Sequence, residues 1–296
     1  MTTVTVLDGG MGRELMRIGA PFRQPEWSAL ALTEGPQWVV QAHRNFIEAG
    51  AQVITTNSYA VVPFHIGDDR FRLEGRELAA LSGSLAREAA TTRPGVTVAG
   101  SLPPLFGSYR PDMFDAAAAP AIIDPLVAGL SDHVDVWLGE TLSSIAEVAA
   151  VRAALDRHDG PVRPLWISHY LHDQQLGVLA SGESVADAVS AAIDCGAAVV
   201  MFNCCSAEAI GEAIPIAVSV AAGRAQVGGY ANRFVTAHTE IGQANSRLSE
   251  FRDDLDPTTY CTIIVDWLDA GATMVGGCCG MTPAHITAIS EMISSR

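Results

Sequence analysis

Three segments of this sequence repeat one pattern, in which a helix ends at a glycine and a short apolar strand follows. They are "FIEAGAQVITTN" from residue 46, "AIDCGAAVVMFN" from residue 192 and "WLDAGATMVGGC" from residue 267. Gly50, Gly196 and Gly271 occupy the position just after the last helical turn, and branched apolar residues follow each of them. This pattern predicts the joint of a repeated strand-helix unit.

Five further segments have the same strand character, which brings the number of predicted strands to eight. They are "VTVLDGG" from 4, "VTVAGSLPP" from 96, "DVWLGET" from 135, "PLWISHY" from 164 and "AQVGGYAN" from 225. The strands recur about every 30 to 45 residues with helical stretches between them, a spacing typical of parallel strands joined by crossover helices. Eight such units predict an α/β protein with the (β/α)8 TIM barrel fold.

An open doubly wound sheet is the alternative fold. Such a sheet usually carries a G-x-G-x-x-G loop after its first strand, and "DGGMGREL" lacks that spacing. No linker rich in Pro, Gly or Ser divides the chain, and "DPTTYCTIIVDW" is interpreted as a long helix with Asp256 as its N-cap and Pro257 in its first turn. We therefore expect residues 1–296 to form a single barrel domain.

The composition narrows the range of partners. An apolar fraction of 49% with only 17% charged residues is typical of a deep core, and a net charge of −15 argues against binding to a nucleic acid backbone. No apolar run approaches the ~18 residues of a membrane helix, and the N-terminus does not resemble a signal peptide. We expect a cytoplasmic protein that binds small molecules and neither membrane nor nucleic acid; the sequence does not indicate its oligomeric state.

Six cysteines occur in the chain, and in a reducing compartment clustered cysteines indicate metal binding or catalysis rather than disulfides. Cys195 lies at the end of a predicted helix, and Cys261 lies in a helix whose apolar stripe includes Tyr260, Ile264 and Trp267. Both are predicted to pack as small hydrophobic residues. The other four are Cys204, Cys205, Cys278 and Cys279.

Polar residues gather at the predicted carboxyl ends of the strands, where the active sites of TIM barrels lie. These ends carry Asp8, Asn57 with Tyr59, Ser101, Glu140, His169, Asn203 with Cys204, Asn232, and Cys278 with Cys279. The sixth and eighth strands have one strand between them, so their ends should lie roughly 10 Å apart. Inward side chains could close that gap around an ion, which brings three or four cysteines to one site.

Three thiolates would leave one position open on a tetrahedral zinc ion, as in catalytic rather than structural zinc sites. Such an ion is a poor hydrolytic Lewis acid, but it keeps a fourth thiol deprotonated at neutral pH. The site therefore suits alkyl transfer to sulfur. The alternatives are a redox disulfide between neighbouring cysteines, a structural zinc site completed by a fourth ligand such as Cys205, and an adventitious metal trap.

Taken together, the motifs resemble those of the homocysteine S-methyltransferase family, zinc-dependent barrels that methylate homocysteine to methionine. The matching segments are "LDGGMG", "TTNSY", "GET", "FNC" and "GGCCG", and they cover nearly the whole chain. The resemblance implies that Cys204, Cys278 and Cys279 are zinc ligands, although Cys205 directly follows the first of them. It also implies that Asp8 and Glu140 hold the amino acid substrate.

Other residues have less definite roles. The resemblance places Tyr59 beside the zinc ion and the substrate, whereas Asn57, Asn203 and Asn232 are candidate donors to the substrate or to the loop backbone. Asp8 could instead cap the following helix, and Glu140 could pair with an arginine. His169 matches no family role and is interpreted as a buried, hydrogen-bonded histidine, with a proton shuttle or a contact to the methyl donor as the alternative. No other catalytic residue is required.

The resemblance implies that homocysteine binds zinc through its sulfur, loses its proton and attacks the methyl carbon of an onium donor. S-methylmethionine is the first expectation for that donor in a compact chain, with S-adenosylmethionine and betaine as alternatives. Two other functions are compatible with the cysteine cluster: a barrel that binds zinc or thiols without catalysis, and a redox protein that uses the neighbouring cysteines.

Overall fold

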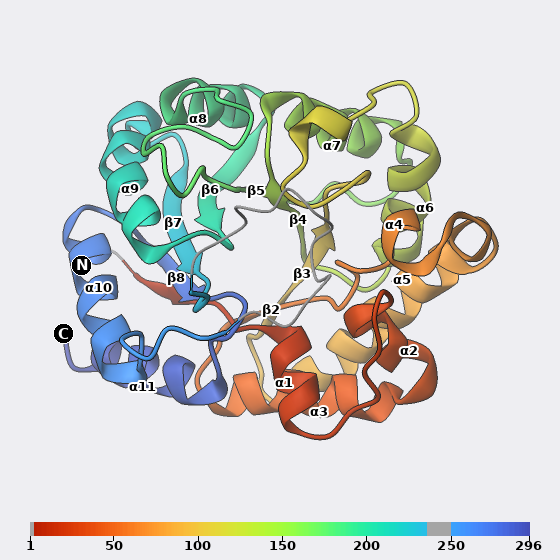
Figure 1. Cartoon of the computed structure of the whole chain (residues 1–296), viewed down its shortest axis with the longest axis horizontal. Coiled ribbons are helices and arrows are strands. Elements are labelled where there is room, and N and C mark those ends of the chain that lie inside the picture. The colour runs from red at the N-terminus through yellow and green to blue at the C-terminus, as the bar shows by residue number, and fades with distance from the viewer. Residues whose placement is uncertain (1–2, 236–249) are drawn as a thin grey trace.

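A computed structural model describes residues 3–235 and 250–296 of the chain. Eight parallel strands form the centre and helices surround them (Figure 1). The strands are β1 (Thr5–Val6), β2 (Val53–Thr55), β3 (Thr97–Leu102), β4 (Val136–Leu142), β5 (Leu165–His169), β6 (Ala197–Asn203), β7 (Gln226–Ala231) and β8 (Met274–Gly277). The predicted (β/α)8 TIM barrel is confirmed, with each predicted strand at its expected place.

The sheet closes on itself between its first and second strands. β1 pairs with β8 through Thr5 and Met274, and its other edge meets β2 at a bridge between Leu7 and Val53. The Gln52 amide extends this contact by donating to the Val6 carbonyl over 2.8 Å. Closure leaves no exposed sheet edge and brings all eight carboxyl ends to one rim.

The outer ring consists of helices that connect successive strands, together with one helix that follows the last strand. The helices are α1 (Met11–Arg17), α2 (Leu30–Glu34), α3 (Pro36–Glu48), α4 (Pro63–Ile66), α5 (Asp68–Ala90), α6 (Pro120–Leu130), α7 (Ile145–Arg157), α8 (Val185–Asp194), α9 (Ala207–Ala221), α10 (Pro257–Asp269) and α11 (Pro283–Ser294). Gly50, Gly196 and Gly271 follow α3, α8 and α10 with φ of 109°, 83° and 105°, as the repeated pattern predicted. Among the described residues, no helix has the length and apolarity needed to cross a bilayer.

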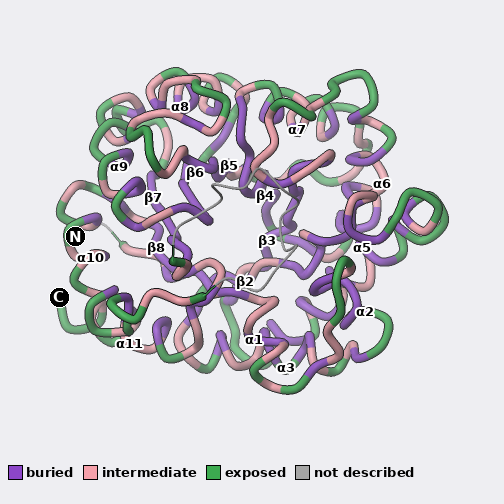
Figure 2. The backbone as a smooth tube through the Cα atoms, viewed as in Figure 1, coloured by how far each residue is buried: buried purple, intermediate pink, exposed green. Residues whose placement is uncertain are grey.

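The buried apolar residues form two clusters, which are the two parts of the core. Figure 2 shows that the strands at the centre of the barrel are mostly buried. The larger part lies between the strands and the helices, and Cys195 and Cys261 pack at its margin as predicted. The smaller part fills the barrel with alternate strand residues: Leu7, Val53, Ala99, Val136, Leu138, Val199, Met201, Tyr230 and Met274. The N-cap prediction for α10 is also confirmed, because the Asp256 carboxylate accepts from the Thr258 and Thr259 amides.

Above this apolar filling, nearer the carboxyl ends, the next inward positions are polar. We call Thr55, Ser101, Glu140, Ser168, Asn203 and Tyr230 the polar layer; most follow an apolar interior residue by two positions, so they share its face of the sheet. The members bond to one another: Ser168 Oγ donates to Asn203 Oδ1 over 2.7 Å, and Tyr230 Oη donates to Glu140 over 3.4 Å. This layer forms the floor of the candidate site.

Candidate functional site at the barrel mouth

A cavity opens at the carboxyl ends of the strands, directly above the polar layer. Its lining comes from six strand ends and two adjoining loops and includes Asp8, Met11, Trp27, Thr55, Asn57, Tyr59, Tyr109, Glu140, Thr141, Cys204, Tyr230, Cys278 and Cys279. All three predicted zinc ligands and four of the five predicted substrate-binding residues therefore meet in one place. Asn232 is absent from this lining.

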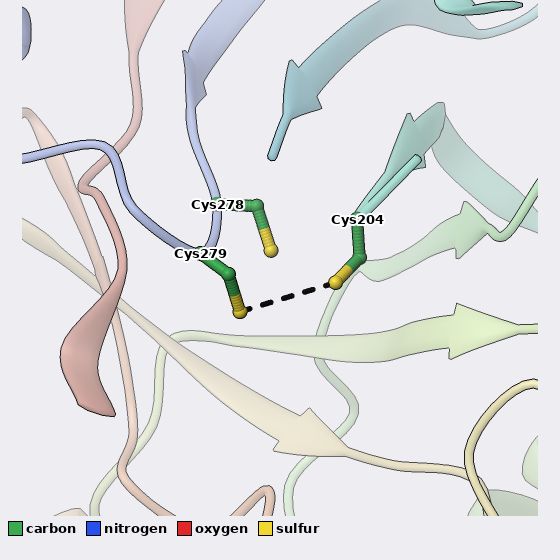
Figure 3. A group of neighbouring side chains, drawn as sticks. All are labelled: Cys204, Cys278 and Cys279. Carbon is green, nitrogen blue, oxygen red and sulfur yellow. Dashed lines mark hydrogen bonds between the residues drawn. The ribbon is translucent and has the colours of Figure 1, made fainter. Parts of the chain in front are cut away.

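The three cysteines converge although they come from distant parts of the chain. The sulfur atoms of Cys204, Cys278 and Cys279 all lie within 4.8 Å of one another, and the Sγ atoms of Cys204 and Cys279 are 4.0 Å apart (Figure 3). Hydrogen bonds from Cys204 and Cys278, together with the nearby Arg13 guanidinium, lower the pKa of Cys279 well below its ordinary value. The cluster can accommodate a metal ion that prefers thiolate ligands.

Backbone geometry separates Cys204 from Cys205. Cys204 adopts a left-handed conformation with φ of 58° at the end of β6, and its thiol faces the cluster. Cys205 is fully buried in the larger part of the core, between the strands and the helices, where burial raises the pKa of its thiol. The structure thus places Cys204, and not Cys205, beside Cys278 and Cys279.

Asp8 and Glu140 are the two carboxyl groups of the cavity. Asp8 accepts from the Thr55 amide over 2.7 Å and does not cap α1, whose N-cap is Gly10. Glu140 accepts from Ser101 Oγ over 2.5 Å, and within the described residues it forms no ion pair with an arginine. Burial raises the pKa of Asp8 above its ordinary range and that of Glu140 to about 7, and the two groups also repel each other.

No lysine or arginine lines this cavity in the part of the chain that the structure describes. Two buried carboxyl groups without a cationic partner are costly unless a ligand supplies the positive charge. The arrangement therefore favours a ligand with an ammonium or another cationic group between Asp8 and Glu140.

Aromatic side chains form another wall of the cavity. Tyr59 shares a hydrogen bond with Ser108 over 2.8 Å, and Tyr109 shares one with Cys204 Sγ over 2.9 Å. Burial raises the pKa of both phenols, which therefore stay neutral. Trp27, 7% exposed, completes the wall. Neither Tyr109 nor Trp27 was predicted from the sequence, because Tyr109 lies in a loop and Trp27 begins a single short 3-10 helix, Trp27–Ala29, so neither belongs to a periodic pattern.

The predicted asparagines mainly hold the backbone. Asn57 Nδ2 donates to the Ser28 carbonyl over 2.9 Å, and Asn203 Oδ1 accepts from the Thr141 amide over 3.1 Å. Asn232 Nδ2 donates to the Cys204 carbonyl over 2.6 Å. His169 is fully buried beside Phe202 and outside the cavity lining, and burial lowers its pKa to about 4. It is therefore a neutral histidine at neutral pH.

Comparison with known proteins yields one family. The sequence model described as "Homocysteine S-methyltransferase" matches residues 5–293. The homocysteine S-methyltransferase of Escherichia coli K12 is 27% identical over 308 residues, covering 97% of this chain and 94% of that protein. A selenocysteine methyltransferase of Astragalus bisulcatus is 29% identical over 327 residues, covering 98% of this chain and 92% of its own length.

Solved structures also resemble this chain. The metallated form of the homocysteine methyltransferase MmuM from Escherichia coli superimposes with a TM-score of 0.80 at 26% identity, covering 97% of this chain and 96% of that one. A methyltransferase from Methanosarcina mazei, 14% identical with a TM-score of 0.61, shares the fold. The fold, the cysteine cluster and the match over residues 5–293 agree: the chain belongs to the homocysteine S-methyltransferase family of enzymes.

Proposed function

We propose that this protein transfers a methyl group from an onium donor to the thiol of homocysteine, giving methionine, and that it requires zinc. The observation that carries the proposal is the meeting of three cysteine sulfurs with two buried carboxyl groups in one cavity that lacks lysine and arginine among its described lining residues. The thiol of an amino acid substrate matches the cysteine cluster, and its amino group matches the two carboxyl groups.

The cysteine cluster supports zinc as the metal. Tetrahedral ligands at the Zn–S distance of ~2.3 Å lie about 3.8 Å apart, close to the 4.0 Å between the Sγ atoms of Cys204 and Cys279. When bound, zinc would supply the Lewis acidity that keeps a fourth thiol deprotonated at neutral pH. The metallated form of MmuM supports metal binding in this family.

Asp8 and Glu140 would bind the substrate's ammonium group in this proposal. The ammonium would supply the positive charge that both carboxyl groups lack, and binding it would lower their pKa values toward the ionised state. The Thr55 amide holds one carboxyl group, and the Ser101 hydroxyl holds the other. The amino acid would therefore be held at one end, while its thiol reaches the cysteine cluster at the other.

The aromatic wall supports a cationic donor. Trp27, Tyr59 and Tyr109 can attract a sulfonium or quaternary ammonium group through the faces of their rings. S-methylmethionine is the donor that we favour, with S-adenosylmethionine or betaine as alternatives. The substrate thiolate would attack the methyl carbon; a new C–S bond forms while the bond from that carbon to the donor's onium atom breaks, and its electron pair stays with the donor. Alignment of the reactants is worth roughly 7 to 11 kcal/mol in favourable cases.

A donor panel tests the proposal. Zinc-loaded protein is incubated with homocysteine and, separately, S-methylmethionine, S-adenosylmethionine or betaine, and methionine is measured. We expect methionine with at least one donor from the wild type, none from Cys279→Ala and wild-type yields from Cys261→Ala. Absence of methionine with every donor would support instead a barrel that binds thiols without catalysis.

Two further proposals accompany this function. We infer that residues 1–296 form one domain, because the family match spans residues 5–293 and one closed sheet includes strands from Thr5 to Gly277. We also propose a cytoplasmic location, since all six cysteines are free and reduced thiols persist there.

A further inference from the structure

A ring of hydroxyl groups extends the sheet beyond the end of β2. β2 ends at Thr55 while β3 continues to Leu102, so the peptide groups of Ser101 have no strand partner on that side. Side chains take its place: Ser58 Oγ donates to the Ser101 carbonyl over 2.8 Å, and the Ser101 amide donates to Thr56 Oγ1 over 3.0 Å. The hydroxyls of Thr56 and Ser58 are themselves bonded over 2.8 Å.

This ring fixes the position of Ser101. Thr56, Ser58 and Ser101 are all buried, with 3%, 0% and 0% of their surface exposed, so water does not compete for their hydrogen bonds. Because Ser101 is an inward residue of the polar layer, its own hydroxyl points across to β4. There it donates to Glu140 Oε2 over 2.5 Å, the length of a strong bond to a carboxylate.

Glu140 depends on this bond for its orientation. Among the described residues, its other carboxyl oxygen receives a single long bond of 3.4 Å, from the Tyr230 hydroxyl. A glutamate side chain that is free to rotate loses conformational entropy when a ligand fixes it, and this loss weakens binding. A donor that orients Glu140 beforehand reduces this cost at the moment of binding.

We propose that Ser101, anchored by Thr56 and Ser58, is a positioning residue that aims Glu140 at the ammonium group of the thiol substrate and so determines selectivity for an amino acid thiol. This inference rests on the proposed function. Ser101 does not line the cavity, and it acts through Glu140.

Selectivity provides the test. Wild type and Ser101→Ala are assayed with homocysteine and with 4-sulfanylbutanoate, which has the same thiol chain but lacks the amino group. We expect Ser101→Ala to raise the KM for homocysteine about ten-fold, the effect of losing one hydrogen bond to a charged group. The KM for the methyl donor and the kcat/KM for 4-sulfanylbutanoate should change by less than about two-fold.

A double-mutant cycle separates positioning from general damage. If Ser101 acts through Glu140, Ser101→Ala should add no further loss of selectivity in a Glu140→Gln background. Ser82→Ala is the matched control, because Ser82 is also fully buried but donates to the Ala79 carbonyl within α5. If Ser101→Ala does not fold, Ser58→Ala replaces it; this variant keeps the Ser101 hydroxyl, loses the carbonyl anchor and should show a smaller loss of selectivity.

The outcomes distinguish the inference from the function on which it rests. A wild type that makes no methionine contradicts the proposed function. A wild type that selects homocysteine, together with a Ser101→Ala variant that selects it equally well, overturns the role of Ser101 and leaves the function intact. The role of Ser101 is also overturned if Ser101→Ala reduces selectivity in the Glu140→Gln background as much as it does in the wild type.

Discussion

Cys204 and Cys205 are neighbours in the sequence but lie in different environments. The left-handed conformation of Cys204, with φ of 58°, brings its sulfur to the two cysteines that follow β8. Cys205 instead packs in the larger part of the core, between the strands and the helices, with none of its surface exposed. A left-handed conformation is costly for a residue other than glycine, and it persists here because the surrounding loops fix it.

Replacement of these two cysteines should have opposite effects. We expect Cys204→Ala to lose bound zinc, as should Cys278→Ala and Cys279→Ala, because two thiolates remain where three are needed. Cys205→Ala should keep about one zinc per chain and lose only packing stability. Metal analysis after dialysis measures the difference, and Cys261→Ala is a second cysteine control. Zinc retained by Cys204→Ala but not by Cys205→Ala would contradict the assignment.

The ionisation of Glu140 should appear in the pH profile. Burial raises its pKa to about 7, so the carboxyl group is neutral below that pH and cannot balance an ammonium group. We therefore expect kcat/KM for homocysteine to decrease as the pH falls below about 7, and this limb to change in position in a less active Glu140→Gln variant, in which Asp8 is the remaining carboxyl group of the cavity. A wild-type profile that stays flat from about pH 5.5 to about pH 8 would exclude this role.

The residues after β7 are hydrogen-bonded to both loops that carry the cysteines. Asn232 Nδ2 donates to the Cys204 carbonyl, and the Asn232 amide donates to the Cys205 carbonyl over 3.1 Å. The next residue, Arg233, donates its amide to the Cys279 carbonyl over 2.8 Å. β7 lies between β6 and β8 in the sheet, so its end can hold both cysteine loops in register.

Loss of the Asn232 side chain should loosen the cysteine cluster. We expect Asn232→Ala to weaken zinc binding about 10-fold or more, the range found when groups that orient metal ligands are removed. Competition with a zinc chelator measures this affinity. If Asn232 instead contacts the substrate, as the sequence analysis allowed, zinc affinity will remain at the wild-type value while the KM for homocysteine increases.

The closed barrel brings together residues that lie far apart in the sequence. The cysteine cluster joins the ends of β6 and β8, and the carboxyl groups come from β4 and the segment after β1. A ligand held by such separate elements stabilises the folded state, because the unfolded chain does not preserve the site.

Metal removal should therefore lower thermal stability. With free zinc at about 100 times its Kd, binding stabilises the folded state by about 2.7 kcal/mol. We expect the Tm to fall by several degrees when a chelator removes zinc from the wild type, and to change little in Cys204→Ala. Scanning calorimetry measures both values. An equal fall in both proteins would show that the metal stabilises the fold from another place.

Local sequence patterns predicted most of the fold and part of the candidate site. The glycines after α3, α8 and α10, with the apolar strands that follow them, predict the barrel from local sequence alone. The barrel rule then placed Asp8, Glu140 and the cysteines at one rim, and the cavity contains them. Tyr109 could not be found in this way, because its contact with Cys204 spans 95 residues and begins in an irregular loop.

Neighbouring residues specify the helix endings and the alternation of strands and helices. These local patterns were therefore enough to predict the rim at which polar residues meet and the cysteines at two strand ends. Local patterns could not show which cysteine of residues 204 and 205 joins the cluster, or that Ser101 holds Glu140 from 39 positions away. Those choices depend on one backbone torsion and on hydrogen bonds between separate strands, which exist only once the barrel has closed.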